Sequence, residues 1–292
     1  MFWQQIINGL SIGAIYALMA VGYSLIYSLM NFTNFAHGIV VTVGAYVGYY
    51  VLTYFSTRIT VAVGIALAVG MLVSVLIEIT TYRPLLLKNA RRLFLMIAGL
   101  GLSIIAENLI IITLSGRFKA YPNELLKMGT FQVLNVNIGI IDAIVLGISI
   151  VALIMVQMYV QYTRDGLAIR AASFSLENAS IMGINTDGLM IKVFAIAGIL
   201  AGIAGFFLGM KYTAYPQLGS TLTNKAFISA VLGGLGSLPG AVLGAFILGV
   251  TETLVAGYIS SAMRDIFAFA LLVVILLIRP SGLMGKSSDD KA

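Results

Sequence analysis

The sequence lacks cysteine altogether, has a single histidine, and carries few charged residues for its length. Without cysteine, the chain can form no disulfide and can supply no thiolate for a metal site or for nucleophilic catalysis. His37 alone does not make the paired-histidine motif of a metalloprotease. Charged residues make up 10% of the 292 residues and apolar residues 60%, whereas a soluble domain normally carries about 25% charged residues. The chain is therefore too apolar for a water-soluble protein. Because it also lacks cysteines and paired histidines, we expect it to bind no cofactor itself.

Long apolar runs take the place of a mixed polar and apolar pattern. A run of about 20 apolar residues crosses the hydrocarbon core of a bilayer as a helix. Strands of a membrane β-barrel alternate in polarity over about ten residues, which continuous runs such as Ile138 to Val156 do not. We therefore predict an all-α polytopic membrane protein with eight or nine spans in one transmembrane domain, residues 1–292. The expected spans are 6–29, 36–54, 61–81, 93–114, 138–161, 190–210, 221–234, 240–257 and 264–279.

Lysine and arginine residues near the span ends predict the orientation, because they gather in cytoplasmic loops. They follow the third, fifth and last spans: Arg83, Lys88, Arg91, Arg92, then Arg164, Arg170, Lys192, then Arg279, Lys286, Lys291. This places the N-terminus outside and the C-terminus inside, although Arg117, Lys119 and Lys127 then lie in an outer loop. The first run begins near Met1 without a basic leader, so we expect it to be a retained span. Topology and lipid headgroups account for the net charge of +6 without nucleic acid.

Two polar or glycine-rich segments, Asn31–Gly38 and Gly233–Gly240, interrupt the apolar runs. Such interruptions in corresponding halves are typical of inverted repeats with discontinuous helices around a substrate pathway. Backbone that is not helical persists at membrane depth only where protein or a wet cavity satisfies it. The alternative is that both segments are ordinary short loops.

The longest expected cytoplasmic loop, about 162–191, has the pattern of a short capped helix. Ser175 is suited to cap its start, with Glu177 in the first turn, and Gly183 is suited to end it. Asn185 then caps the following span. The residues that we expect this helix to present to a partner are Phe174, Glu177, Ala179, Ile181, Met182 and Gly183. A short helix with an apolar face either rests on lipid headgroups or docks a cytosolic protein.

No nucleotide-binding motif is complete. Gly285-Lys286-Ser287 matches the end of a P-loop, but Pro280 stands where its first glycine is needed. Gly234-Leu-Gly236 has no preceding strand for a dinucleotide fold. We therefore expect that the chain is not an enzyme and that any ATP is hydrolysed by another subunit.

Polar residues within the apolar runs are the candidates for a translocation pathway. A carboxylate at mid-bilayer costs about 2.5–3.5 kcal/mol on insertion scales and so needs a partner or water. The candidates are Asn34, His37, Glu107, Asn108 and Glu252. The alternative is that they make structural hydrogen bonds across the bundle. Glu78 and Asp142 lie near span ends, where we expect headgroup exposure.

Several motifs in order along the chain resemble one family of permeases. They are Gln5-Ile-Ile-Asn-Gly-Leu-Ser-Ile-Gly-Ala-Ile-Tyr-Ala-Leu18, Asn34-Phe-Ala-His-Gly38, Glu177-Asn-Ala-Ser-Ile-Met-Gly-Ile-Asn-Thr-Asp187, Ala230-Val-Leu-Gly-Gly-Leu-Gly-Ser-Leu-Pro-Gly240 and Ile278-Arg-Pro-Ser-Gly-Leu283. Together they look like LivH-type permease subunits of bacterial branched-chain amino-acid ABC importers. Ile39 stands where such relatives often carry an acidic residue, which leaves the solute open.

The resemblance implies a heteromeric importer in the bacterial inner membrane. This subunit would pair with a second, homologous permease above two cytosolic ATPase subunits that hold ATP and magnesium. An extracytoplasmic binding protein would deliver the solute, and the helix around Glu177–Gly183 would couple the permease to an ATPase. Relatives also carry urea or short amides. Two other interpretations stay open: an ion-coupled secondary transporter that uses Glu107 or Glu252, and a structural membrane subunit that carries no solute.

Overall fold

The computed structural model describes residues 2–55, 58–122, 129–133 and 136–285. Lys127, Lys286, Ser287 and Lys291, which the sequence analysis names, lie outside these ranges.

The described chain is almost entirely helical, which confirms the predicted fold class. Its helices are α1 (Phe2–Met30), α2 (His37–Tyr50), η1 (Val51–Phe55), α3 (Ile59–Ile77), η2 (Glu78–Tyr82), α4 (Arg83–Leu87), α5 (Arg92–Leu114), α7 (Ile140–Tyr162), α8 (Arg164–Ala172), α9 (Leu176–Ile181), α10 (Thr186–Lys211), α11 (Leu218–Gly233), α12 (Leu238–Tyr258), η3 (Ser261–Met263) and α13 (Arg264–Ile278). A short hairpin pairs β1 (Thr130–Val133) with antiparallel β2 (Val136–Gly139).

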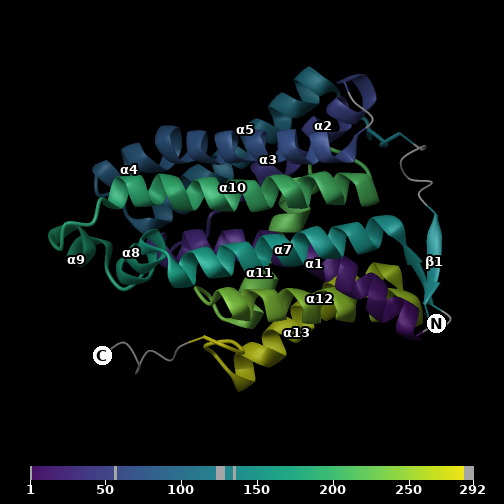
Figure 1. Ribbon diagram of the computed structural model, residues 1–292. Coiled ribbons are helices and arrows are strands. Elements are labelled where there is room, and N and C mark those ends of the chain that lie inside the picture. The colour runs from purple at the N-terminus through teal and green to yellow at the C-terminus, as the bar shows by residue number, and fades with distance from the viewer. Residues whose placement is uncertain (1, 56–57, 123–128, 134–135, 286–292) are drawn as a thin grey trace.

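Eight helical segments of the described chain are long and apolar enough to cross a membrane. The remaining expected span, 221–234, corresponds to α11, which has only 16 residues. The helices lie side by side, with the hairpin at one end of the bundle and α9 at the other (Figure 1). We call these the β1 end and the α9 end. Helices α1 and α10 are mostly buried in the centre, whereas α5 and α13 expose most of their surface.

The molecule contains two matching broken-helix units. Six residues, 31–36, separate α1 from α2, and six residues, 212–217, separate α10 from α11. Helix α10 packs against α2 and α3, and in the same way α1 packs against α11 and α12. Helix α1 runs away from the β1 end whereas α10 runs toward it (Figure 1). The two units therefore have opposite directions, as expected for an inverted repeat.

The two breaks meet where α2 and α11 begin. The Cα atoms of Gly38 and Gly219 lie so close that a Cβ atom on either residue would overlap backbone atoms of the other. The Thr42 hydroxyl accepts a 3.0 Å hydrogen bond from the Gly219 amide, and the Thr223 hydroxyl donates 2.8 Å to the Gly219 carbonyl. Side chains thus satisfy part of the backbone exposed by the breaks, which is the condition for non-helical backbone at membrane depth.

The prediction that Gly233–Gly240 is the counterpart of the first break is wrong, because segment 212–217 holds that place. Residues 234–237 form a tight turn between α11 and α12, with positive φ angles at Gly234 (106°) and Gly236 (86°). Ser237 caps α12 by accepting a hydrogen bond from the Gly240 amide at 3.2 Å. Glycine is needed at 234 because residue 285 of the C-terminal segment lies against it.

Candidate functional site

The loop expected at 162–191 contains two helices, α8 and α9, at the α9 end of the bundle (Figure 1). Helix α9 is the one predicted from the sequence, whereas α8 was not predicted. Thr163 caps the start of α8, and its hydroxyl accepts a hydrogen bond from the Gly166 amide at 3.0 Å. This threonine cap is the signal in the sequence that could have identified the helix.

The structure confirms the predicted boundaries of α9. The Ser175 hydroxyl accepts a hydrogen bond from the Asn178 amide at 3.1 Å. At the other end, Gly183 has a φ angle of 85°, and the Ile184 amide donates to the Ala179 carbonyl at 3.0 Å. This is the glycine-terminated arrangement that satisfies the last carbonyl groups of a helix.

One side of the α8–α9 element carries exposed apolar side chains. Phe174 is 68% exposed, Ile181 76% and Met182 83%, and Glu177 is exposed beside them. The expectation that Ala179 belongs to the presented face is wrong. Ala179 is only 5% exposed and is therefore covered by the rest of the protein. The exposed apolar surface is therefore made by Phe174 just before α9 and by Ile181 and Met182 at its end.

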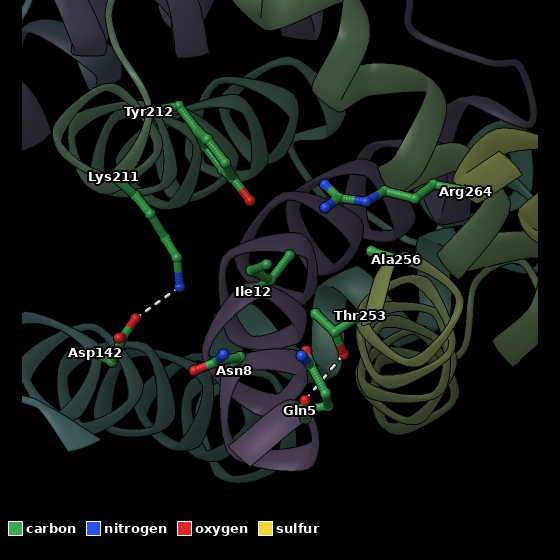
Figure 2. Close-up of a pocket in the computed structure, with 9 residues that line it drawn as sticks. All are labelled: Gln5, Asn8, Ile12, Asp142, Lys211, Tyr212, Thr253, Ala256 and Arg264. Carbon is green, nitrogen blue, oxygen red and sulfur yellow. Dashed lines mark hydrogen bonds and ion pairs between the residues drawn. The ribbon is translucent and has the colours of Figure 1, made fainter. Parts of the chain in front are cut away.

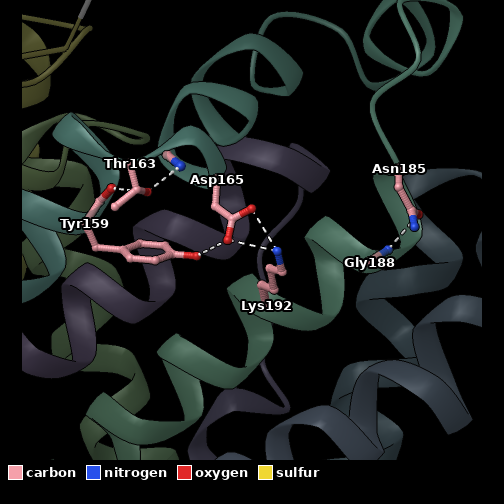
Figure 3. A network of polar contacts seen from close by, with 7 residues as sticks. Tyr159, Thr163, Asp165, Asn185, Gly188 and Lys192 are labelled. Carbon is pink, nitrogen blue, oxygen red and sulfur yellow. Dashed lines mark hydrogen bonds and ion pairs between the residues drawn. The ribbon is translucent and has the colours of Figure 1, made fainter.

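A polar network fixes α8 to the transmembrane helices (Figure 3). The Lys192 ammonium of α10 donates to both carboxylate oxygens of Asp165, at 2.7 and 2.8 Å. The Tyr159 hydroxyl of α7 donates to Asp165 at 2.8 Å. The hydrogen bond from Lys192, and then that from Tyr159, hold the pKa of the Asp165 carboxyl below its usual value. The start of α8 is thereby tied to both neighbouring spans.

The first break holds two of the predicted pathway residues in the interior. Asn34 is 3% exposed and accepts a hydrogen bond from the Tyr82 hydroxyl at 2.5 Å. His37 begins α2 and is 1% exposed. Neither of its ring nitrogens has a hydrogen-bond partner among the described residues.

Glu107 and Asn108 lie on different sides of α5. Glu107 is half-buried and lines a narrow crevice with Gly38 and Thr42 of α2. Asn108 is exposed, and its amide donates to the Ile104 carbonyl of its own helix at 2.7 Å. The structure thus brings Glu107, but not Asn108, to the junction of the broken helices.

Glu252 is the centre of a buried ionic cluster. Its side chain is 5% exposed and accepts hydrogen bonds from the Lys225 ammonium at 2.5 Å and the Tyr16 hydroxyl at 2.8 Å. Lys225 also donates to Asp265, whose side chain is 73% exposed. Lys225 was not among the predicted residues, although a lysine inside an expected span is itself a functional signal.

A second ionic cluster lies nearer the β1 end. The Lys211 ammonium donates to Asp142 at 2.6 Å and to the Ser11 hydroxyl at 3.1 Å, and Ser11 donates to Asp142 at 2.7 Å. We expected Asp142 to be exposed at the lipid headgroups. Its side chain is instead only 25% exposed and is paired with Lys211.

The expectation that Glu78 is exposed at the headgroups is wrong. Glu78 is fully buried, and neither carboxylate oxygen has a hydrogen-bond partner among the described residues.

Two cavities adjoin these clusters. The outer cavity has a volume of about 310 Å³ (Figure 2) and is lined by Gln5, Asn8, Ile12, Asp142, Lys211, Tyr212, Thr253, Ala256 and Arg264. The inner cavity has a volume of about 270 Å³ and is lined by Tyr16, Leu208, Tyr212, Tyr215, Leu218, Thr221, Leu222, Lys225, Glu252, Arg264 and Asp265. Both cavities share Tyr212 and Arg264, and we call the pair the cleft.

Comparison with known proteins gives one family over most of the chain. The family described as "Branched-chain amino acid transport system / permease component" matches residues 5–276. The high-affinity branched-chain amino acid transport system permease protein LivH of Salmonella typhimurium is 35% identical, over 99% of this chain and 97% of its own. The high-affinity branched-chain amino acid transport system permease protein BraD of Pseudomonas aeruginosa is 32% identical, over 99% of this chain and 98% of its own. A probable LivH of Methanocaldococcus jannaschii is 27% identical over 92% and 88%.

A solved structure shares the fold. A chain of PsaBC from Streptococcus pneumoniae, in complex with Fab, aligns with a TM-score of 0.53 over 94% of this chain and 91% of that one. The two sequences are only 12% identical, so this likeness concerns the arrangement of the helices alone.

Proposed function

Because the chain belongs to the branched-chain amino acid transport system permease family, we propose that it is the permease subunit of an ATP-driven importer for branched-chain or related amino acids. The observation that carries this proposal is the family match across residues 5–276. The multi-pass helical architecture fits a transmembrane conduit, and the clustered ionisable residues inside it are typical of solute pathways.

The α8–α9 element is the proposed docking site for a cytosolic ATPase. Three features support this role: it projects beyond the spans (Figure 1), it exposes Phe174, Ile181 and Met182, and the Asp165–Lys192 pair joins it to α10. An exposed apolar patch on a short, well-capped helix is suited to a groove on a partner. ATP and magnesium would be held by two such ATPase subunits, and not by this chain.

The proposed orientation places the α9 end in the cytoplasm and the β1 end outside. Arg83, Arg164, Arg170 and Lys192 all lie in or beside the short helices of the α9 end, as the distribution of positive charge requires. The β1 end would then receive solute from an extracytoplasmic binding protein. The largely exposed helices α5 and α13 are suited to contact lipid and a second, homologous permease.

Uptake of labelled L-leucine into right-side-out vesicles that contain the co-purified subunits and enclosed ATP tests the proposal. We expect uptake to require ATP and the ATPase subunits. Uptake that survives removal of the ATPases and stops when the proton gradient is dissipated would identify an ion-coupled secondary transporter instead. Preferential uptake of urea or acetamide would keep the importer but change its solute, and absence of any uptake would favour a structural subunit.

The docking role has its own test within the same assay. Ile181→Glu places a charge in the exposed apolar patch, and we expect it to abolish coupling between ATP hydrolysis and uptake while membrane insertion is unchanged. Ile181→Met keeps an apolar side chain at the same position and is the matched control. Uptake by Ile181→Glu at the wild-type rate would contradict ATPase docking through α9.

A further inference from the structure

The charged side chains of the cleft are distributed unevenly between its two sides. Lys211 is matched by Asp142, but Lys225 is shared by two carboxylates, Glu252 and Asp265. One side of the inner cavity therefore carries an excess negative charge.

Arg264 carries the corresponding positive charge. It lines both cavities, and it forms an ion pair with none of the carboxylates that the structure describes. Its Nε atom is buried and has no hydrogen-bond partner among the described residues. Figure 2 shows its guanidinium directed across the cavity toward Tyr212. A guanidinium in this position offers the paired N–H groups that bind a carboxylate.

Most of the remaining wall of the inner cavity is apolar. Leu208, Leu218 and Leu222 line it, together with the rings of Tyr16 and Tyr215. Leu218 and Leu222 are almost fully buried. A site of about 270 Å³ with largely apolar walls and a few convergent polar groups has the character of a small-molecule site, just below the usual size range.

The inner cavity lies about one helical turn deeper than the outer one. Tyr16 follows Ile12 by four residues on α1, and Glu252 precedes Ala256 by four residues on α12, which is about one turn in each case. A solute entering from the β1 end would pass the polar outer cavity before its apolar part reached the leucine wall.

We propose that the cleft is an intramembrane binding site for a zwitterionic amino acid, a role that rests on the proposed function. Arg264 binds the α-carboxylate, the shared carboxylates Glu252 and Asp265 bind the α-ammonium, and the leucine wall receives an aliphatic side chain. The charges of the cleft sum to zero formally, and so do those of the ligand. An ion of a single sign would leave either Arg264 or the shared carboxylates uncompensated, and the cost would fall mainly on the buried groups, Arg264 and Glu252.

Equilibrium binding of tritiated L-leucine to the assembled complex in phosphatidylglycerol nanodiscs, without the binding protein, tests this site. We expect leucinamide, which lacks the carboxylate, and 4-methylpentanoate, which lacks the ammonium, to compete roughly ten- to hundred-fold less well than leucine. Displacement of leucine by phosphoethanolamine at equal strength would assign the cleft to a lipid headgroup and overturn the proposal.

Arg264→Gln should lower leucine affinity by a similar factor and remove the preference for leucine over leucinamide. That preference is the ratio of the two affinities measured on the same variant. A smaller amount of folded protein would lower both binding signals equally and leave this ratio unchanged. Arg279→Gln, at the far end of the same helix, is the matched control and should bind leucine normally. Asp265→Asn removes one of the two shared carboxylates and should weaken leucine binding, whereas 4-methylpentanoate should bind more tightly because the excess negative charge is gone.

Unchanged leucine affinity and selectivity in Arg264→Gln would overturn the site. So would the absence of leucine binding by a wild-type complex that still takes up leucine in vesicles. In both cases the proposed function stands, because it is judged by ATP-dependent uptake alone.

Discussion

Gly38 at the start of α2 and Gly219 at the start of α11 lie against each other, so that a Cβ atom on Gly219 would overlap the Gly38 carbonyl oxygen. Each glycine also faces the threonine that follows its partner by four residues, Thr223 for Gly38 and Thr42 for Gly219. The symmetry of these contacts makes this junction the centre of the inverted repeat. Small residues at such points allow helix backbones to approach closely.

Gly219→Ala should destabilise the protein by about 1–3 kcal/mol, because overpacking at this contact requires the two broken helices to move apart. The measurement is thermal unfolding of the purified protein in detergent. Gly64→Ala on α3 is the control, since a Cβ atom there meets nothing within 4 Å and alanine favours a helix more than glycine does. Equal melting temperatures for both variants would show that the glycine contact does not constrain the fold.

Much of the fold could be predicted from the sequence, because hydrophobic length alone defines a spanning helix. Nearly every expected span lies within a few residues of a helix in the structure. The second break could not be located. Segment 212–217 is short and lies between a basic residue, Lys211, and polar residues of α11, so the sequence predicts only an ordinary loop there. The matching packing of α1 and α10 and the contact between Gly38 and Gly219, which are far apart in the chain, identify it as the counterpart of 31–36.

The candidate site could likewise be predicted from the sequence only in part. The caps of α9 were predictable, because Ser175 and Gly183 act on backbone groups within a few residues of themselves. The ionic clusters were not, since Lys225 binds a carboxylate 27 residues away and Ser11 binds one 131 residues away. Pairings of this kind depend on helix packing and rotation, which apolar runs do not specify.

Replacement of Gly183 should disturb α9 through backbone conformation alone. Its φ angle is 85° and no atom lies near its Cβ position, so a side chain meets strain but no steric clash. Gly183→Val should uncouple ATP hydrolysis from uptake, whereas Gly183→Asn should be much milder, because asparagine tolerates this conformation. The ratio of solute imported to ATP hydrolysed is the measurement. An equal ratio for the valine and asparagine variants would contradict a role for this backbone geometry.

The contact of Asp165 with Lys192 and Tyr159 should weaken in acid. The pKa of Asp165 is below its ordinary value of 3.8 in the folded protein, so its stabilising contribution is fully present above that value and is lost as the pH falls through the lowered pKa. At neutral pH, Asp165→Asn should increase amide hydrogen exchange in α8 relative to the wild type. The difference between the two proteins should disappear well below pH 3.8. A difference that persists at the same size in acid would show that the charge of Asp165 does not hold α8.

The buried pair of Lys225 and Glu252 should show strong coupling in stability. Lys225→Met removes the ammonium from a carboxylate that is 5% exposed and leaves it only the Tyr16 hydroxyl. Breaking a buried ion pair on one side costs about 3–5 kcal/mol, whereas replacing both partners by apolar residues is often nearly neutral. We therefore expect Lys225→Met to lower the melting temperature sharply in the absence of solute, and Lys225→Met/Glu252→Met to recover most of the loss. Asp265→Asn should have little effect in the same assay, because its side chain is 73% exposed and Lys225 keeps Glu252. A double variant as unstable as the single one would mean that Lys225 stabilises the bundle through its packing and not through its charge.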